Sequence, residues 1–175
     1  LSGNSGEVSI DSRLGIISID TINTRVSFGN AGSVVLSAPT GNIETVVDGI
    51  QASTAVGNGG AVEILAGGSV TVQGPIDTKA QVSANQSTGQ GGDITVRSGD
   101  NLTINGQILA RATPGGRTSG PISAGRGGNV ALFSGGSITI AGDPVAIDSR
   151  SQTVVIGPNS QASAGGDITV IAVRD

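Results

Sequence analysis

The sequence contains no cysteine, histidine, methionine, tryptophan or tyrosine, and its two aromatic side chains are Phe28 and Phe133. Without cysteine and histidine there is no disulfide framework, no thiolate or imidazole metal site, and no Cys/His or Ser/His/Asp catalytic arrangement. Aromatic side chains normally supply much of a globular core, so a core of the ordinary type is not expected. The absence of thiols suits a secreted protein, because nothing in the chain can be oxidised during export.

Charge is also scarce. Charged residues make up 13% of the chain, the formal net charge is −4 and the isoelectric point is near 4.6. The sequence has no basic stripe with interleaved aromatics, which argues against a nucleic-acid partner. No apolar run approaches the roughly 20 residues of a membrane-spanning helix, so membrane insertion is not expected. No cofactor-binding motif is present, and no cofactor is expected.

The chain is instead rich in glycine, with 30 residues, and in valine and isoleucine arranged in a repeat. A pair of small or polar residues followed by an apolar-x-apolar triplet recurs six times, and a second triplet and a third short apolar segment follow in the first five units. Self-similarity of this kind indicates a repeat architecture rather than a disordered low-complexity chain. The units begin at Gly6, Gly32, Gly60, Gly92, Gly128 and Gly166.

Each unit therefore carries three short strands of alternating pattern, separated by turn residues. Such strands cannot bury a face alone, but stacked units place equivalent strands about 4.8 Å apart in three parallel sheets. The prediction is an all-β fold, a right-handed parallel β-helix or three-faced β-solenoid of about five coils plus one strand, in a single domain over residues 1–175. An antiparallel sandwich is the alternative that strand spacing leaves open.

Two inward-facing columns of aliphatic side chains are expected from the matching triplets. The first column consists of Val8, Val34, Val62, Ile94, Val130 and Ile168. The second consists of Ile10, Leu36, Ile64, Val96, Leu132 and Val170. The interior of a coil of this kind is narrow, which explains why aliphatic residues fill it.

Three stretches carry a family resemblance: GNGGAVEILAGGSVTVQGPIDT (57–78), GQGGDITVRSGDNLTINGQILA (89–110) and GRGGNVALFSGGSITIAGD (125–143). They resemble the repeats of filamentous-haemagglutinin-type proteins, especially the large cyanobacterial ones. The resemblance covers most of residues 57–175 and, more weakly, 1–56. It implies a right-handed parallel β-helix, export by two-partner secretion, and a role as adhesin, stalk or matrix component at or beyond the cell surface.

The Gly91-Gly92-Asp93 segment has the composition of a calcium or phosphate loop, but its context differs from both. Calcium-loaded β-rolls need an aspartate in every stacked turn, whereas the positions equivalent to Asp93 in the other units hold Glu, Ser, Ala, Asn and Asp. Phosphate loops lead into a helix N-terminus, and a strand follows these glycines. The glycines are interpreted as turn residues, and no metal site is expected.

Enzymatic chemistry on a β-helix requires carboxylates clustered at outward positions of adjacent coils. Glu63 is expected beside Val35 and Thr95, and no acidic pair emerges at matching positions. The sequence therefore predicts a non-enzymatic protein, with a polysaccharide-degrading enzyme as the least favoured reading. A binding role is the alternative: Arg111, Arg117 and Arg126 fall in the acid-free connection 110–127 and are candidates for contact with a surface polysaccharide.

Neither end of the sequence carries a recognisable polar cap, which solenoids normally have. We therefore expect either a piece of a longer solenoid or head-to-tail stacking of copies into a filament outside the cell. The chain itself is then the expected partner. The residues predicted to form the end-to-end contact are Val8, Ile10, Ile168, Val170, Ile171 and Val173.

Overall fold

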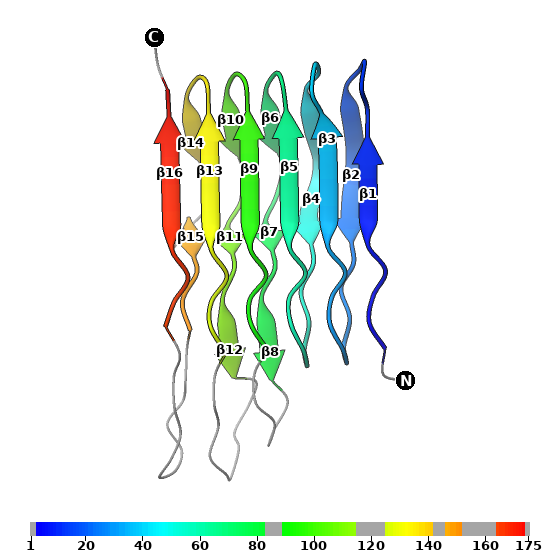
Figure 1. Ribbon diagram of the computed structural model, residues 1–175, viewed down its shortest axis with the longest axis vertical. Coiled ribbons are helices and arrows are strands. Elements are labelled where there is room, and N and C mark those ends of the chain that lie inside the picture. The colour runs from blue at the N-terminus through cyan, green and yellow to red at the C-terminus, as the bar shows by residue number, and fades with distance from the viewer. Residues whose placement is uncertain (1–2, 83–88, 115–124, 142–145, 152–163, 174–175) are drawn as a thin grey trace.

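The computed structural model describes residues 3–82, 89–114, 125–141, 146–151 and 164–173 (Figure 1). These parts form β-strands and turns, and they contain no helix. Every strand pair among them is parallel. Strands from successive units lie side by side along the molecule, so the N-terminal and C-terminal strands lie at opposite ends of the stack. The all-β, parallel, solenoid-like architecture expected from the repeats is confirmed.

The first triplets of the six units form one sheet, in the order β1-β3-β5-β9-β13-β16. Equivalent residues pair at every step; Val62, for example, pairs with Val34 on one side and Ile94 on the other. The strands are β1 (Val8–Asp11), β3 (Val34–Ala38), β5 (Val62–Ala66), β9 (Ile94–Ser98), β13 (Val130–Ser134) and β16 (Ile168–Ala172).

The second and third apolar segments share one sheet of eight strands, which differs from the separate sheets expected. β4 (Ile43–Gln51) runs through both segments without interruption and pairs with β6 at its start and β7 at its end. The other strands of this sheet are β2 (Ile17–Asn23), β6 (Val70–Val72), β7 (Ile76–Asp77), β10 (Leu102–Ile104), β11 (Ile108–Leu109), β14 (Ile138–Ile140) and β15 (Ile147–Asp148). The third sheet consists of β8 (Ala80–Val82) and β12 (Ala112–Pro114).

Aliphatic side chains from the two larger sheets form a single core. Alternation along each strand places every second residue inside, because successive side chains of a strand point to opposite faces. The two predicted columns are confirmed in the middle of the stack. Their residues there are at most 1% exposed: Val34, Val62, Ile94, Val130, Leu36, Ile64, Val96 and Leu132.

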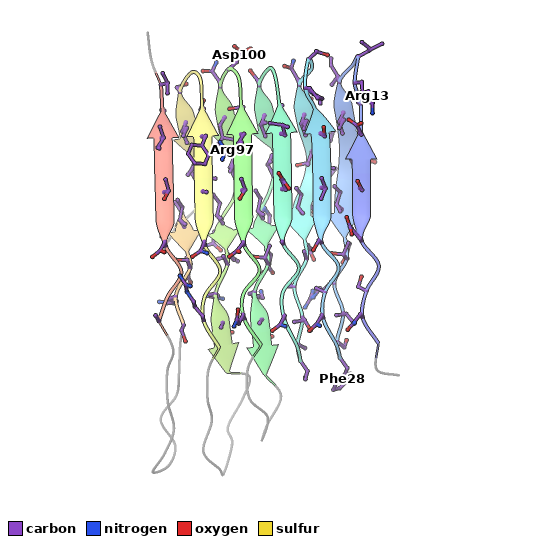
Figure 2. All side chains as sticks on the ribbon, viewed as in Figure 1. Arg13, Phe28, Arg97 and Asp100 are labelled. Atoms are coloured by element: carbon purple, nitrogen blue, oxygen red, sulfur yellow. The ribbon has the colours of Figure 1, made fainter. Side chains whose placement is uncertain are left out.

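Both aromatic side chains lie outside this core. Phe28 is 51% exposed at a turn (Figure 2). Phe133 occupies an outward position of β13, where the guanidinium carbon of Arg97 lies 4.1 Å from the centroid of its ring. The core is thus built from aliphatic side chains, as the narrow interior requires.

The corner glycines bring two backbone segments into direct contact across the interior. The N–H of Gly92 donates to the carbonyl of Thr78 at 2.8 Å, and the hydroxyl of Thr78 donates back to the carbonyl of Gly92 at 2.6 Å. A Cβ atom at Gly92 would meet the carbonyl oxygen of Gly60, its counterpart in the preceding unit. The sequence prediction that these glycines shape a turn is therefore only part of their role, because stacking also requires them.

We expect Gly92→Ala to lower the free energy of unfolding by about 3 kcal/mol, since the new methyl group would overlap a fixed backbone carbonyl. Gly6→Ala is the matched control: it lies in the same column, but no atom lies within 4 Å of its ideal Cβ. Its expected effect is within about 0.5 kcal/mol. Urea denaturation followed by circular dichroism measures both, and equal effects of the two substitutions would contradict the steric explanation.

Candidate functional site

The residues predicted to form an end-to-end contact lie on the two edge strands of the six-stranded sheet. Val8 and Ile10 on β1 are partly buried and pack against the core. Ile168 and Val170 on β16 continue the two inward columns, because they pair with Val130 and Leu132, yet they are 50% and 47% exposed. An edge strand also presents unpaired backbone N–H and C=O groups, which can pair with another strand.

Two further residues of that prediction occupy different surroundings. Ile171 pairs with Phe133 on the outward face of the sheet, and not with a core residue. Val173 follows β16, and its N–H donates to the carbonyl of Ser134 at 2.9 Å. The structure therefore groups Ile168 with Val170 and separates Ile171 from them.

The arginines proposed to contact a polysaccharide have carboxylate partners within the chain. Arg111 lies 3.0 Å from the carboxylate of Asp148. Arg126 lies 3.0 Å from the side-chain oxygen of Asn129 and 3.5 Å from the carboxylate of Asp167. Arg117 lies outside the described residues. The two described arginines thus bind different groups, and their contacts do not bring them together.

A row of basic side chains runs along the stack instead. Backbone pairing places Lys79, Arg111 and Arg150 at equivalent positions of successive units. Lys79 lies 3.0 Å from Asp77, and Arg150 lies 3.3 Å from the second oxygen of Asp148. Sequence analysis missed these pairs, although an acid two residues before a base in the third segment of a unit is a visible signal.

Asp93 belongs to a ladder of side chains at one corner, which we call the corner column. Its members directly precede the six strands of the first sheet: Glu7, Ser33, Ala61, Asp93, Asn129 and Asp167. The Oδ1 of Asp93 accepts the N–H of Asn129 at 2.7 Å, and the Oδ1 of Asn129 accepts the N–H of Asp167 at 3.0 Å. Asp93 and Asn129 each bind the backbone of the next unit in this way, so Asp93 has a stacking role.

A second ladder runs beside the corner column. The side-chain oxygens of Asn4, Asn30 and Asn58 accept the backbone N–H groups of Asn30, Asn58 and Gln90 at 3.0, 2.9 and 2.9 Å. Such bonds join residues in different units, so they hold the parallel strands in register. An asparagine recurs in the sequence two residues before the lead glycine of each of the first three units, and this recurrence could have predicted the ladder.

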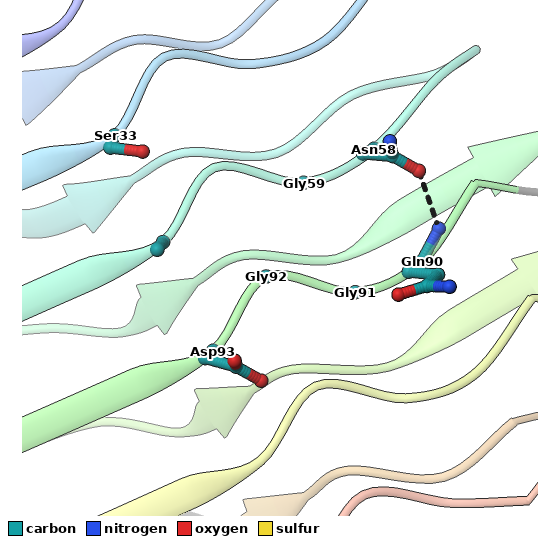
Figure 3. Close-up of a pocket in the computed structure, with 8 residues that line it drawn as sticks. Ser33, Asn58, Gly59, Gln90, Gly91, Gly92 and Asp93 are labelled. Carbon is teal, nitrogen blue, oxygen red and sulfur yellow. Dashed lines mark hydrogen bonds between the residues drawn. The ribbon is translucent and has the colours of Figure 1, made fainter.

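A polar hollow of about 310 Å³ opens between the two ladders (Figure 3). It lies among the side chains of Ser33, Asn58, Ala61, Gln90 and Asp93 and the glycines between them. We call it the corner hollow. Across the described part of the chain there is no group of three or more acidic side chains placed to hold a metal ion.

Comparison with protein families, characterised proteins and solved structures gives no significant match for this chain. In the residues that the structure describes there is no helix long and apolar enough to cross a membrane.

The ion pair of Arg111 predicts a stabilising role for this residue. Its side chain is 28% exposed and its partner Asp148 is 6% exposed, so we expect Arg111→Ala to cost about 1.5 kcal/mol of unfolding free energy. The matched control is Arg13→Ala, because the Arg13–Asp11 pair is 87% and 49% exposed and such pairs contribute little. Chemical denaturation compares the two, and an Arg111→Ala effect no larger than that of Arg13→Ala would contradict the assignment.

Proposed function

We propose that the chain is a non-enzymatic structural β-solenoid that forms a segment or subunit of a filament at the cell surface or in an extracellular matrix. In its full form the proposal includes a single domain, a right-handed coil and about five coils plus one strand. The observation that carries it is the unbroken stacking of equivalent residues, from Val8 through Val34 to Ile168, along the whole first sheet.

Extension of this sheet needs only another parallel strand on its edge. A strand placed on β16 with aliphatic residues over Ile168 and Val170 would enclose them as β16 itself encloses Val130 and Leu132, which are 1% and 0% exposed. Complete burial of one such side chain is worth about 1.5–3 kcal/mol, so covering two half-exposed ones contributes about the same in total. The backbone groups of the edge would be paired in the same step.

β1 has the side chains that such a strand requires. Val8 and Ile10 already occupy the same two columns at the opposite edge of the sheet. The extending strand can come from further residues of the same polypeptide or from a second copy, and both use the same contact. A contact between different edges of identical copies generates an open filament when its rotation does not close into a ring.

The surroundings of Glu63 in the first sheet support a role without catalysis. The outward neighbours of Glu63 are Val35 and Thr95, so in the described sheet this carboxylate has no acidic partner of the kind that glycosidic chemistry needs. The likeness of the repeats to filamentous-haemagglutinin-type proteins supports the extracellular location and export by two-partner secretion.

The purified chain should assemble into filaments as its concentration rises, which negative-stain electron microscopy and analytical ultracentrifugation detect. We expect Val170→Lys to reduce assembly at least about tenfold, because a charge would be buried in the inward column at each junction. Thr169→Lys is the matched control, since Thr169 occupies the outward face of the same strand. Dispersed monomers of the unmodified chain at every concentration would refute self-assembly, and equal loss in both variants would refute the proposed contact.

A further inference from the structure

Side-chain hydrogen bonds of the corner column link only its last three members among the described residues, and the earlier steps have none. Asn129 and Asp167 each donate their N–H to an oxygen on the preceding side chain of the column. Asp93 is one unit earlier, so its N–H faces the side chain of residue 61, which is alanine and has no oxygen. The structure gives the N–H of Asp93 no hydrogen-bond partner among the described residues, and the same holds for the N–H of Ala61.

The step of the column from Ala61 to Asp93, which has no side-chain hydrogen bond, lies at the corner hollow. Ala61 and Asp93 both line it, and the short side chain of Ser33 lies one unit before Ala61 and two units before Asp93 (Figure 3). A missing side chain thus leaves both the space and the donors for a ligand oxygen in the same place. Small-molecule pockets have volumes of about 300–1,000 Å³, so a hollow of about 310 Å³ suits one small unit.

The side chains that line the corner hollow favour an uncharged ligand that carries hydroxyl groups. The Oδ1 of Asn58 is occupied by the N–H of Gln90, which leaves the amide nitrogen of Asn58 as a donor, and Gln90 and Ser33 add groups that donate and accept. Asp93 is the charged side chain of the lining, and it is negative, so it disfavours carboxylate, sulfate and phosphate ligands. Hydroxyl groups meet these requirements because each can accept and donate.

We propose that the corner hollow binds one neutral, hydroxyl-rich sugar unit of a glycan. One ring hydroxyl replaces the missing side-chain oxygen at position 61 and accepts the N–H of Asp93. Other hydroxyls of the ring reach the amides of Asn58 and Gln90. Neither Arg111 nor Arg126 lines this site. The site favours neutral over acidic glycans, and it does not depend on filament formation.

The direct test is a titration of the ¹⁵N-labelled full chain, followed by amide chemical shifts. The probes are neutral tetrasaccharides of glucose, galactose and mannose, with tetragalacturonate as the acidic probe of equal length. We expect saturable shifts of the Ala61 and Asp93 amides with at least one neutral probe and none with tetragalacturonate. If no neutral probe shifts these amides, the hollow holds water alone and the proposal is wrong; binding of tetragalacturonate with equal affinity also overturns it.

A substitution that supplies the missing side-chain oxygen separates binding from folding. In Ala61→Asn the new side-chain oxygen takes up the N–H of Asp93, so we expect about tenfold weaker sugar binding together with unchanged or higher thermal stability. Ala141→Asn is the matched control, because Ala141 is exposed, follows β14 and lies outside the hollow. It should bind as the unmodified chain does.

A second variant covers the case in which Ala61→Asn fails to fold. Ser33→Asn fills the hollow from the neighbouring unit and offers an oxygen to the N–H of Ala61, so it should weaken binding as well. Unchanged sugar affinity in a folded Ala61→Asn or Ser33→Asn chain would overturn the proposal. Filament formation is measured separately on the same variants, and its failure would leave the sugar titration interpretable.

Discussion

The structure depends on the close stacking of one unit directly on the next, through parallel main-chain hydrogen bonds. This stacking explains the glycine content, because a Cβ at Gly92 would occupy the space of the Gly60 carbonyl oxygen. It also explains the aliphatic core. The coil is so narrow at the corner that Gly92 and Thr78 bond to each other across it, and an aromatic ring would not fit between them. Phe28 and Phe133 both lie outside the core.

The columns and their register could be predicted from the sequence because they depend on two local facts, alternation within a strand and repetition between units. Val34, Val62 and Ile94 occupy the same place in three units, and they pair as that place requires. The second and third segments share one sheet because β4 continues from Ile43 to Gln51 through a register shift against β2, and the sequence pattern does not show this. The structure confirmed the parallel stack, while the assembly contact and the extracellular role stay hypotheses.

The candidate sites were less accessible to sequence reasoning, because they depend on which side chains face each other between units. Arg111 is followed by no acid in its own connection, yet Asp148 of the next unit lies 3.0 Å away. The same holds for the ladders, where Asn58 binds Gln90, 32 positions later. With 13% charged residues, this chain places several of its charges in pairs between or within units, where they hold strands in register.

The corner column shows how such a stack can accommodate a binding site at little structural cost. Ala61 and Asp93 are exposed residues, so the lack of a side-chain oxygen at position 61 leaves a donor near solvent rather than an unsatisfied group in the core. Loss of a single polar side chain therefore creates a donor and a space together, while the aliphatic columns and main-chain bonds beneath stay intact. Either a side-chain oxygen at position 61 or a ligand hydroxyl can accept the N–H of Asp93, but not both. Asparagine at residue 61 would therefore favour stability and weaken ligand binding.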